Sequence, residues 1–357
     1  MFRLVRLFKY QEHPTMKEVT PIGLRKSDHM RINLEENVQS GLTTGLEHYH
    51  FINQALPEIN LFEIDTSATV FGKHLAVPIL ISSMTGGTSE TVKINQVLAK
   101  AAQETGVAMG VGSQRIALEN PGLASNFQIR QYAPDILLFA NLGAIQLNYG
   151  YEIEACQRAV AMIEADALVL HFNAIQEAIQ QDGNTQFAGL IDKVEAVCKA
   201  LSVPVIAKEV GWGFSQQDVT LLTQAGVAAI DTSGAGGTSW SQVEMFRAKN
   251  EEQKKLAEAF LDWGIPTSEV IRNIIEVAPN VKIIASGGLR NGVDIAKCIA
   301  LGACMGGMAS PFLKAASQSV DETVKLINLL REQLRVCMFA TGSRTLNQLR
   351  QNKLVYE

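Results

Sequence analysis

The fold is indicated first by the stretch PVIAKEVGWGFSQQDVTLLTQAGVAAIDTSG (204–234). It opens on a short apolar run, 204–211, and closes on another, 228–234; each is typical of a strand buried on both faces of a parallel sheet. Between them, residues 215–226 are expected to form a helix, with a Ser cap in front and a Gly stop behind. This strand–helix–strand unit predicts an α/β protein.

The same unit repeats outward in both directions along the chain. A second helix is expected at 90–103, where apolar residues such as Ile94, Leu98 and Ala101 recur at helical spacing. Eight units favour a closed (β/α)8 TIM barrel over an open doubly wound sheet, which the alternation alone also allows. The six further strand candidates are 78–84, 107–115, 136–143, 167–173, 282–288 and 304–310.

Length and composition limit the class of protein. The chain has 357 residues, against about 250 in a simple barrel, and the surplus lies in residues 1–77 and in an insertion after the sixth strand, roughly 235–267. With 47% hydrophobic and 19% charged residues, the chain is not expected to be disordered. No apolar run approaches the roughly 20 residues of a membrane span, and the net charge of −5 argues weakly against nucleic-acid binding.

Cysteine usage and the N-terminal charge bear on location. The five cysteines are scattered without a CxxC pair, so neither a disulfide framework nor a cysteine zinc site is expected, and a reducing, cytoplasmic setting fits. Residues 1–31 hold seven basic and three acidic side chains, a net charge of +4. We expect residues 1–20 to be a poorly ordered extension and not a secretory signal, because they lack a continuous apolar region and a cleavage site. Alone, RKSDH (25–29) would be a solvated charged turn.

Reactive side chains gather where the predicted strands end, and that end of such barrels carries the active site. Lys208 lies alone in an apolar strand, where a lysine is costly unless it meets an anion. It could form a Schiff base with a substrate or face the negative charge of a cofactor. An ion pair with Glu209 is disfavoured because adjacent strand residues face opposite ways. His171 is either a satisfied core histidine or a ligand residue in the barrel mouth.

Two glycine-containing loops indicate a phosphate site. SGGLRNG (286–292) and GGMASPF (306–312) follow the seventh and eighth predicted strands, and these two loops bind phosphate in many such barrels. With Lys208 and Asn141 on the same rim, a flavin is an attractive ligand. Glu177 is a natural Mg²⁺ ligand, because Mg²⁺ commonly takes one or two carboxylates plus phosphate oxygens.

Seven motifs carry a resemblance to a known family. They are RKSDH (25–29), SMTGG (83–87), MGVGSQR (109–115), LHFNAIQE (170–177), VIAKEVG (205–211), DTSGAGGTSW (231–240) and SGGLRNG (286–292). Together they resemble type 2 isopentenyl-diphosphate isomerase, the FMN-dependent isomerase of isoprenoid synthesis. The likeness covers nearly the whole chain from about Gly23, and RKxxH together with LHxNxxQE is specific to that family.

The resemblance implies a cofactor site at the barrel mouth. The phosphate of FMN would lie on the loops after the seventh and eighth strands. The residues implied to hold FMN are Ser83, Met84, Thr85, Ser113, Asn141, Lys208, Ser233, Thr238, Gly288, Leu289, Arg290, Ala309 and Ser310.

The resemblance also implies a substrate site beside the cofactor. Gln176 and Lys208 are then the expected catalytic residues, and Glu177 the ligand that holds Mg²⁺ against the substrate diphosphate. The residues implied to bind the substrate are Arg25, Lys26, His29, Ser113, Gln114, Arg115, His171, Asn173 and Gln176.

The implied reaction moves a double bond by adding one proton and removing another, using reduced FMN without net redox change. NADPH would serve only to reduce the flavin, and the chain has no GxGxxG fingerprint to bind it tightly.

We expect an extension at 1–20, a segment with a substrate flap at 21–77 and the FMN barrel at 78–357. Relatives form tetramers and octamers, so a homo-oligomer acting on a small diphosphate, without nucleic acid or membrane, is expected.

Three alternatives remain to be weighed against the isomerase. An FMN-dependent hydroxy-acid oxidase would need a His and an Arg near the end of the sixth strand, and DTSGAGGTSW has neither. A purine-nucleotide dehydrogenase or reductase would need a nucleophilic Cys on the following loop, where none of the five lies. A barrel that only binds phosphorylated ligands need not place His171, Gln176, Glu177 and Lys208 together on one rim.

Overall fold

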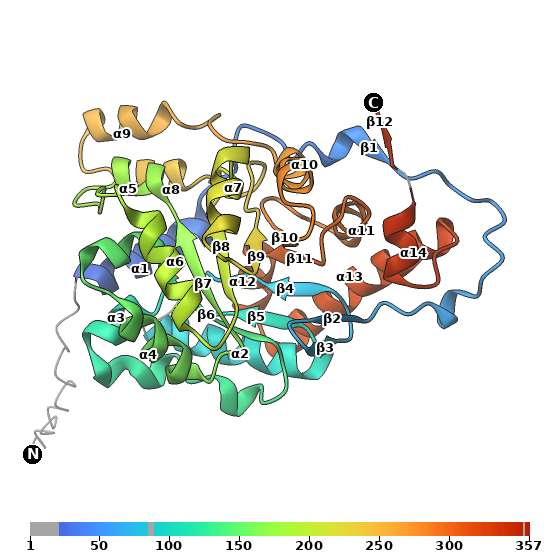
Figure 1. Ribbon diagram of the computed structural model, residues 1–357, viewed down its shortest axis with the longest axis horizontal. Coiled ribbons are helices and arrows are strands. Elements are labelled where there is room, and N and C mark those ends of the chain that lie inside the picture. The colour runs from blue at the N-terminus through green and yellow to red at the C-terminus, as the bar shows by residue number, and fades with distance from the viewer. Residues whose placement is uncertain (1–20, 85–88, 353) are drawn as a thin grey trace, which may run out of the picture.

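Eight parallel strands close into a barrel in a computed structural model that describes residues 21–84, 89–352 and 354–357 (Figure 1). The prediction of a (β/α)8 barrel is confirmed, and each of the eight predicted runs contains one barrel strand. The predictions for residues 1–20 and Thr85 fall outside the described residues. Around the barrel the strands are β4 (Ile79–Ile81), β5 (Ala108–Gly110), β6 (Leu138–Gly143), β7 (Ala167–Phe172), β8 (Val205–Glu209), β9 (Ala229–Asp231), β10 (Lys282–Ala285) and β11 (Met305–Met308).

Helices surround this barrel. Both predicted helices are present: 90–103 lies in α2 (Ser89–Thr105), and 215–226 contains α7 (Gln216–Gln224). The Ser215 hydroxyl accepts from the Asp218 N–H and the Asp218 side chain accepts from the Ser215 N–H, which is a complete capping box. The other outer helices are α4 (Ile153–Ile163), α6 (Leu190–Ala200), α10 (Thr267–Val277), α11 (Gly292–Ala300), α12 (Ser310–Ala316), α13 (Val320–Ala340) and α14 (Leu346–Gln351). None of the helices within the described residues has both the length and the hydrophobicity of a membrane span.

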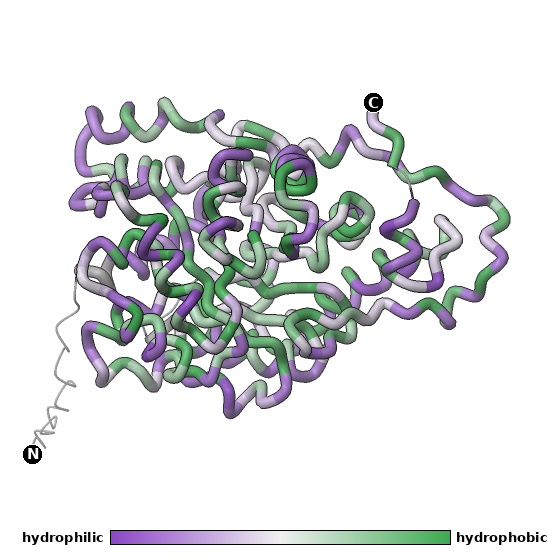
Figure 2. Tube along the Cα trace, in the orientation of Figure 1, coloured by the Kyte–Doolittle hydropathy of each residue, from purple (hydrophilic) through white to green (hydrophobic). Residues whose placement is uncertain are grey.

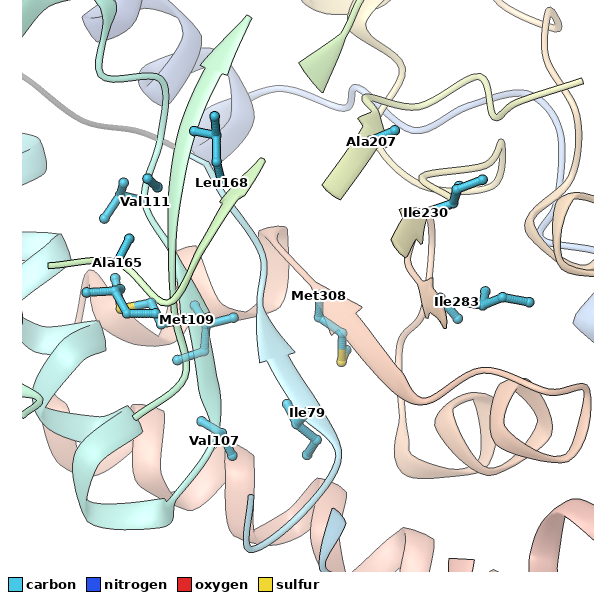
Figure 3. Packing of buried hydrophobic residues seen from close by; sticks show 14 of the residues in the cluster. Ile79, Val107, Met109, Val111, Ala165, Leu168, Ala207, Ile230, Ile283 and Met308 are labelled. Atoms are coloured by element: carbon cyan, nitrogen blue, oxygen red, sulfur yellow. The ribbon is translucent and has the colours of Figure 1, made fainter. Parts of the chain in front are cut away.

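Two apolar layers hold the barrel, because successive strand residues face opposite sides. Leu80, Phe139 and Val169 belong to a cluster that fills the barrel interior, whereas their neighbours Ile79 and Leu168 belong to the larger cluster between strands and helices. Figure 3 shows members of this outer cluster on strands all around the barrel. Figure 2 shows hydrophobic residues concentrated along the strands and hydrophilic ones on peripheral helices such as α9 (Glu251–Glu258).

The amino end of the barrel is closed by an antiparallel hairpin of β2 (Ala68–Val70) and β3 (Lys73–Leu75). Its turn places Phe71 and Gly72 in the left-handed region, with φ of 49° and 79°. Val70 and Leu75 join the interior cluster, and the Phe71 ring lies edge-on to Phe139 at 6.4 Å between centroids. The barrel is therefore packed with apolar side chains at this end.

The N-terminal segment departs from one expectation. RKSDH does not form a turn, because residues 25–29 lie within α1 (Pro21–Glu35), which packs on α8 (Trp240–Arg247) and α12. Beyond α1 the chain runs around the barrel and pairs β1 (Tyr49–His50) with β12 (Val355–Tyr356). The insertion after β9 contains α8 and α9, and the barrel pattern resumes at α10. Short helices complete the chain: η1 (Leu46–His48), η2 (Leu61–Glu63), α3 (Arg115–Glu119), η3 (Pro121–Asn126), η4 (Arg130–Tyr132), η5 (Ala144–Tyr149) and α5 (Ala174–Ile179).

Candidate active site

A cavity of about 510 Å³ opens at the carboxyl ends of the barrel strands, under α1. Its volume lies within the range of small-ligand pockets. Of the predicted site residues that the structure describes, one is not among its lining, Gln114. Thr85 falls outside the described residues. The predicted residues that line it are Arg25, Lys26, His29, Ser83, Met84, Ser113, Arg115, Asn141, His171, Asn173, Gln176, Glu177, Lys208, Ser233, Thr238, Gly288, Leu289, Arg290, Ala309 and Ser310.

Gln114 supports the wall of the cavity from behind and does not face its interior. The side chain is completely buried. Its Nε2 donates to the Ala159 carbonyl oxygen at 2.8 Å, and its Oε1 accepts from the Asn141 N–H at 3.0 Å. With these contacts made, Gln114 holds β6 in place and its side chain does not line the cavity. Its predicted contact with the substrate stays a prediction.

Lys208 meets its anion on the neighbouring strand. Its Nζ lies 3.1 Å from a carboxylate oxygen of Asp231, and it donates to the hydroxyls of Ser233 at 3.1 Å and Ser286 at 3.3 Å. Glu209 faces the other side of β8, as expected. Sequence reasoning missed Asp231, and the available signal was a lone acid in the apolar run AAIDTSG (228–234). The buried pair places a fully hydrogen-bonded cation at the floor of the cavity.

The loops after β9 and β10 approach each other through their backbones. Gly288 has a φ of 82°, and a Cβ added there would lie 2.4 Å from the Gly236 backbone. A Cβ on Gly237 would lie 2.6 Å from the Gly288 nitrogen, so both positions require glycine. Arg290 and Lys314 line the same end of the cavity and give it positive charge. This geometry suits an anionic group held by main-chain N–H groups and cations.

Three cations approach the opposite side of the mouth. The Lys26 ammonium of α1 donates to the Ser113 carbonyl oxygen at 2.8 Å. Arg25 donates to Gln180 at 3.4 Å, and Arg115 pairs with Glu119 at 2.8 Å. Burial lowers the pKa of Lys26 to about 7, and the neighbouring Arg25 acts in the same direction. Such a concentration of positive charge suits a highly charged anion.

A buried acid that sequence reasoning missed, Glu244 of α8, supports Gln176. Its Oε1 accepts from Gln176 Nε2 at 3.0 Å and lies 3.0 Å from His29 Nε2, while its Oε2 accepts from Arg247 at 2.5 Å. Burial acts to raise the pKa of Glu244, but the contacts with His29, Arg247 and Gln176 outweigh it and lower the pKa to about 2. The only signal in the sequence was an acid in the helix after DTSGAGGTSW, because its contacts depend on how the insertion folds.

Glu177, which follows Gln176 in the sequence, accepts hydrogen bonds from uncharged donors. Its Oε1 accepts from Asn173 Nδ2 at 3.1 Å, and its Oε2 accepts from the Asn184 N–H at 2.6 Å and from Gln180 Nε2 at 2.5 Å. The part of the chain that the structure describes contains no group of three metal-ligating side chains. A single carboxylate fits Mg²⁺ only where phosphate and water supply the remaining ligands.

His171 is neutral in this setting. Burial lowers its pKa to about 4, and the charges of Lys208, Lys26 and Arg25 act in the same direction. Its Nδ1 lies 2.8 Å from Asn141 Oδ1. Because an amide oxygen only accepts, Nδ1 carries the proton and Nε2 is an acceptor.

Unpartnered buried polar atoms test whether the cavity suits a polar ligand. Ser82 Oγ, Gln146 Oε1 and Asn173 Oδ1 are buried and have no hydrogen-bond partner among the described residues, and all three residues line the cavity. Such atoms are rare in proteins because each costs about 1–3 kcal/mol. A ligand with several donors and acceptors, such as a flavin with its phosphate, would satisfy them.

Comparison with known proteins gives a matching family model, relatives similar in sequence, and solved structures similar in fold. A family model described as FMN-dependent dehydrogenase matches residues 150–356, more than half of the chain. Isopentenyl-diphosphate delta-isomerase of Nostoc sp. is 52% identical over 94% of this chain and 97% of its own, and that of Rickettsia bellii is 48% identical over 92% and 96%. A mandelate oxidase structure aligns with a TM-score of 0.64 and 17% identity over 94% of this chain and 99% of its own, a likeness of fold.

Proposed function

The chain belongs to the isopentenyl-diphosphate delta-isomerase family, and from that membership we propose that it interconverts isopentenyl and dimethylallyl diphosphate with the help of reduced FMN and Mg²⁺. The proposal rests on one observation. The cations Arg25, Lys26 and Arg115 share a cavity with Gln176 and with Lys208, so a charged head and a reacting tail can be held at the same time.

The cations hold the diphosphate. Arg25 and Lys26 come from α1, outside the barrel, and Arg115 comes from the loop after β5, so the head is gripped from two sides. A bound diphosphate raises the affinity of Lys26 for its proton, because the two charges attract. The negative charge of a bound diphosphate would favour protonation of His171, whose Nε2 could then donate to a phosphate oxygen. Glu177 would hold Mg²⁺ against the phosphate oxygens.

The rim opposite would hold the flavin. Asn141, Lys208 and Ser233 contribute polar groups there, and the contacts with Asp231 and Ser233 fix the orientation of the Lys208 side chain. When bound in its reduced form, FMN supplies the acid–base chemistry of the double-bond shift without net redox change. The residues that would hold it are Ser83, Met84, Ser113, Asn141, Lys208, Ser233 and Thr238, with the phosphate at Gly288, Leu289, Arg290, Ala309 and Ser310.

Gln176 is oriented for proton relay near the reacting carbons. Its amide nitrogen donates to Glu244 and its amide oxygen accepts from Asn173 at 3.1 Å, so neither end is free to exchange with the other. An amide does not titrate near neutral pH, and Gln176 therefore passes a proton only within a hydrogen-bonded chain. The charge of Glu244 keeps that chain aligned.

The direct test is product formation. The purified protein is incubated with isopentenyl diphosphate, FMN, Mg²⁺ and NADPH, and dimethylallyl diphosphate is measured. Product that requires both FMN and a reductant supports the proposal. A yellow, flavin-loaded protein that forms no product would overturn it, and peroxide release from a 2-hydroxy acid would point to an oxidase. Light scattering of the same preparation tests the proposed homo-oligomer, a tetramer or an octamer.

A further inference from the structure

Glu209 is a buried acid that the proposed reaction does not use. It lies next to Lys208 on β8, but it points out of the barrel, because it is in register with Phe172 of β7 whereas Lys208 is in register with His171. The residue is 7% exposed. Within residues 21–84, 89–352 and 354–357 no cation pairs with its carboxylate. Burial raises the pKa of Glu209 to about 7, and hydrogen bonds from backbone N–H groups act against this rise.

Four consecutive N–H groups converge on one oxygen of this carboxylate. The Glu209 Oε2 atom accepts from Val210 at 2.7 Å, Gly211 at 2.7 Å, Trp212 at 2.5 Å and Gly213 at 3.0 Å. Successive N–H groups that face inward in this way form an anion-binding nest. Because four backbone N–H groups meet at this one oxygen, the Glu209 side chain sets the path of residues 210–213. These hydrogen bonds are roughly twice as strong when the carboxylate is ionised.

This loop, which we call the Glu209 loop (210–213), forms part of the cavity wall. Val210 and Gly211 line the cavity beside Lys208. A Cβ at Gly211 would lie 2.7 Å from the Thr238 carbonyl oxygen, so the two backbones are in close contact. The Gly213 N–H donates to the Ser233 carbonyl oxygen at 3.2 Å.

The Glu209 loop also holds the end of the insertion. The Trp212 carbonyl oxygen accepts from the Ile265 N–H at 2.8 Å, and the Ala235 N–H donates to the Ile265 carbonyl oxygen at 2.8 Å. The loop after β8 and the segment 233–238 after β9 are thus connected both directly and through Ile265. Four residues of that segment line the cavity: Ser233, Gly234, Gly237 and Thr238.

We propose that Glu209 is a positioning residue for the cofactor site: its carboxylate folds the Glu209 loop around itself, and the loop in turn places Ser233 and Thr238. The inference rests on the proposed function in one respect, that a flavin occupies this rim. Glu209 is not among the residues that line the cavity, so its loss would loosen the site without removing a ligand contact.

The variant Glu209→Gln tests this, because it keeps the size of the side chain and removes the charge. Asp218→Asn is the matched control, since the Asp218 carboxylate also accepts a backbone N–H, that of Ser215, together with the Ser215 hydroxyl, at the start of α7 and outside the cavity lining. The FMN dissociation constant of each apoprotein is measured by flavin fluorescence, together with its melting temperature. With saturating FMN, the KM for the diphosphate is then compared with the wild-type value.

In Glu209→Gln we expect the FMN dissociation constant to rise by on the order of tenfold, the loss typical of removing a supporting carboxylate, while the KM changes little. In Asp218→Asn the melting temperature should fall and the FMN dissociation constant should stay within about twofold of wild type, because the capping box lies away from the rim. An unchanged FMN affinity in Glu209→Gln would overturn the inference alone. A wild-type protein that takes up no FMN would overturn the inference and the proposed function together.

A measurement on the wild-type protein covers the case in which Glu209→Gln does not fold. Hydrogen exchange of the amides at 210–213 is followed in the apoprotein and compared with that of an exposed loop. Protection of these four amides before flavin is added supports the nest, because each is already hydrogen-bonded. Exchange as fast as in the exposed loop would overturn it.

Discussion

The two ends of the barrel differ in what they bury: apolar side chains at the amino end, and charged and polar groups at the carboxyl end. At the amino end the β2–β3 hairpin covers a cluster of apolar side chains, and Arg130 ties the surrounding loops with a 2.9 Å ion pair to Asp166. At the carboxyl end a cation, several acids and unpartnered polar atoms are buried around a cavity. The packed end therefore provides the stability that the reactive end lacks. Substitutions at the two ends should therefore separate stability from activity.

The largest expected effect lies at the carboxyl end, with Gln176→Ala. Removing the proposed relay should lower kcat by about 10²–10⁴-fold, the usual contribution of a positioned proton-transfer group. The protein should still bind FMN, measured by its absorbance, because Gln176 contacts Glu244 and Asn173 and not the phosphate loops. Gln103→Ala, which removes an exposed amide bonded to Asp135, is the matched control. Near-normal turnover in Gln176→Ala would reject the relay.

Phe139→Ala makes the converse change at the amino end. Phe139 is 1% exposed within the interior cluster, and its truncation leaves a cavity that the closed barrel cannot fill. The free energy of unfolding should fall by about 3–5 kcal/mol, measured by denaturant titration. If KM for the diphosphate also changed substantially, the two ends would not be independent.

Arg25→Ala should have a smaller effect, confined to binding. Arg25 lines the mouth, and its main contact is a 3.4 Å hydrogen bond to Gln180. Losing one charge-assisted contact should raise KM for the diphosphate by about tenfold, with kcat and melting temperature little changed. Steady-state kinetics measure this, and an unchanged KM would remove α1 from the binding site.

The smallest effect is a pH dependence of substrate binding. Burial lowers the pKa of Lys26 to about 7, so the free enzyme loses this positive charge as pH rises through 7 and keeps it below. KM for the diphosphate should therefore rise severalfold between about pH 7 and pH 9. In Lys26→Arg the side chain stays charged throughout this range, and the rise in KM should flatten; an identical profile would contradict the assignment to Lys26.

The sequence predicted the barrel well because its signals are local. Eight apolar runs fell on eight strands, and the Ser215 cap marked the start of α7. What it missed depends on contacts between distant segments. The partnership of Lys208 with Asp231 requires the register of β8 on β9, and the role of Glu244 requires the folded insertion. The support that Gln114 gives to the cavity wall was missed for a related reason, since a motif names a residue without showing which way its side chain faces.

The hairpin at the amino end also limits how ligands enter and leave the cavity. Among the described residues, Phe71 and its neighbours cover that end, so we expect a ligand to reach Lys208 and to leave it through the mouth beside α1. A ligand bound at the mouth therefore slows the dissociation of a ligand bound deeper in the cavity. An inhibitor bound tightly in the diphosphate position should thus slow flavin release, even without touching the flavin. Rapid mixing with a flavin scavenger, with and without the inhibitor, would measure the change in the rate of flavin release.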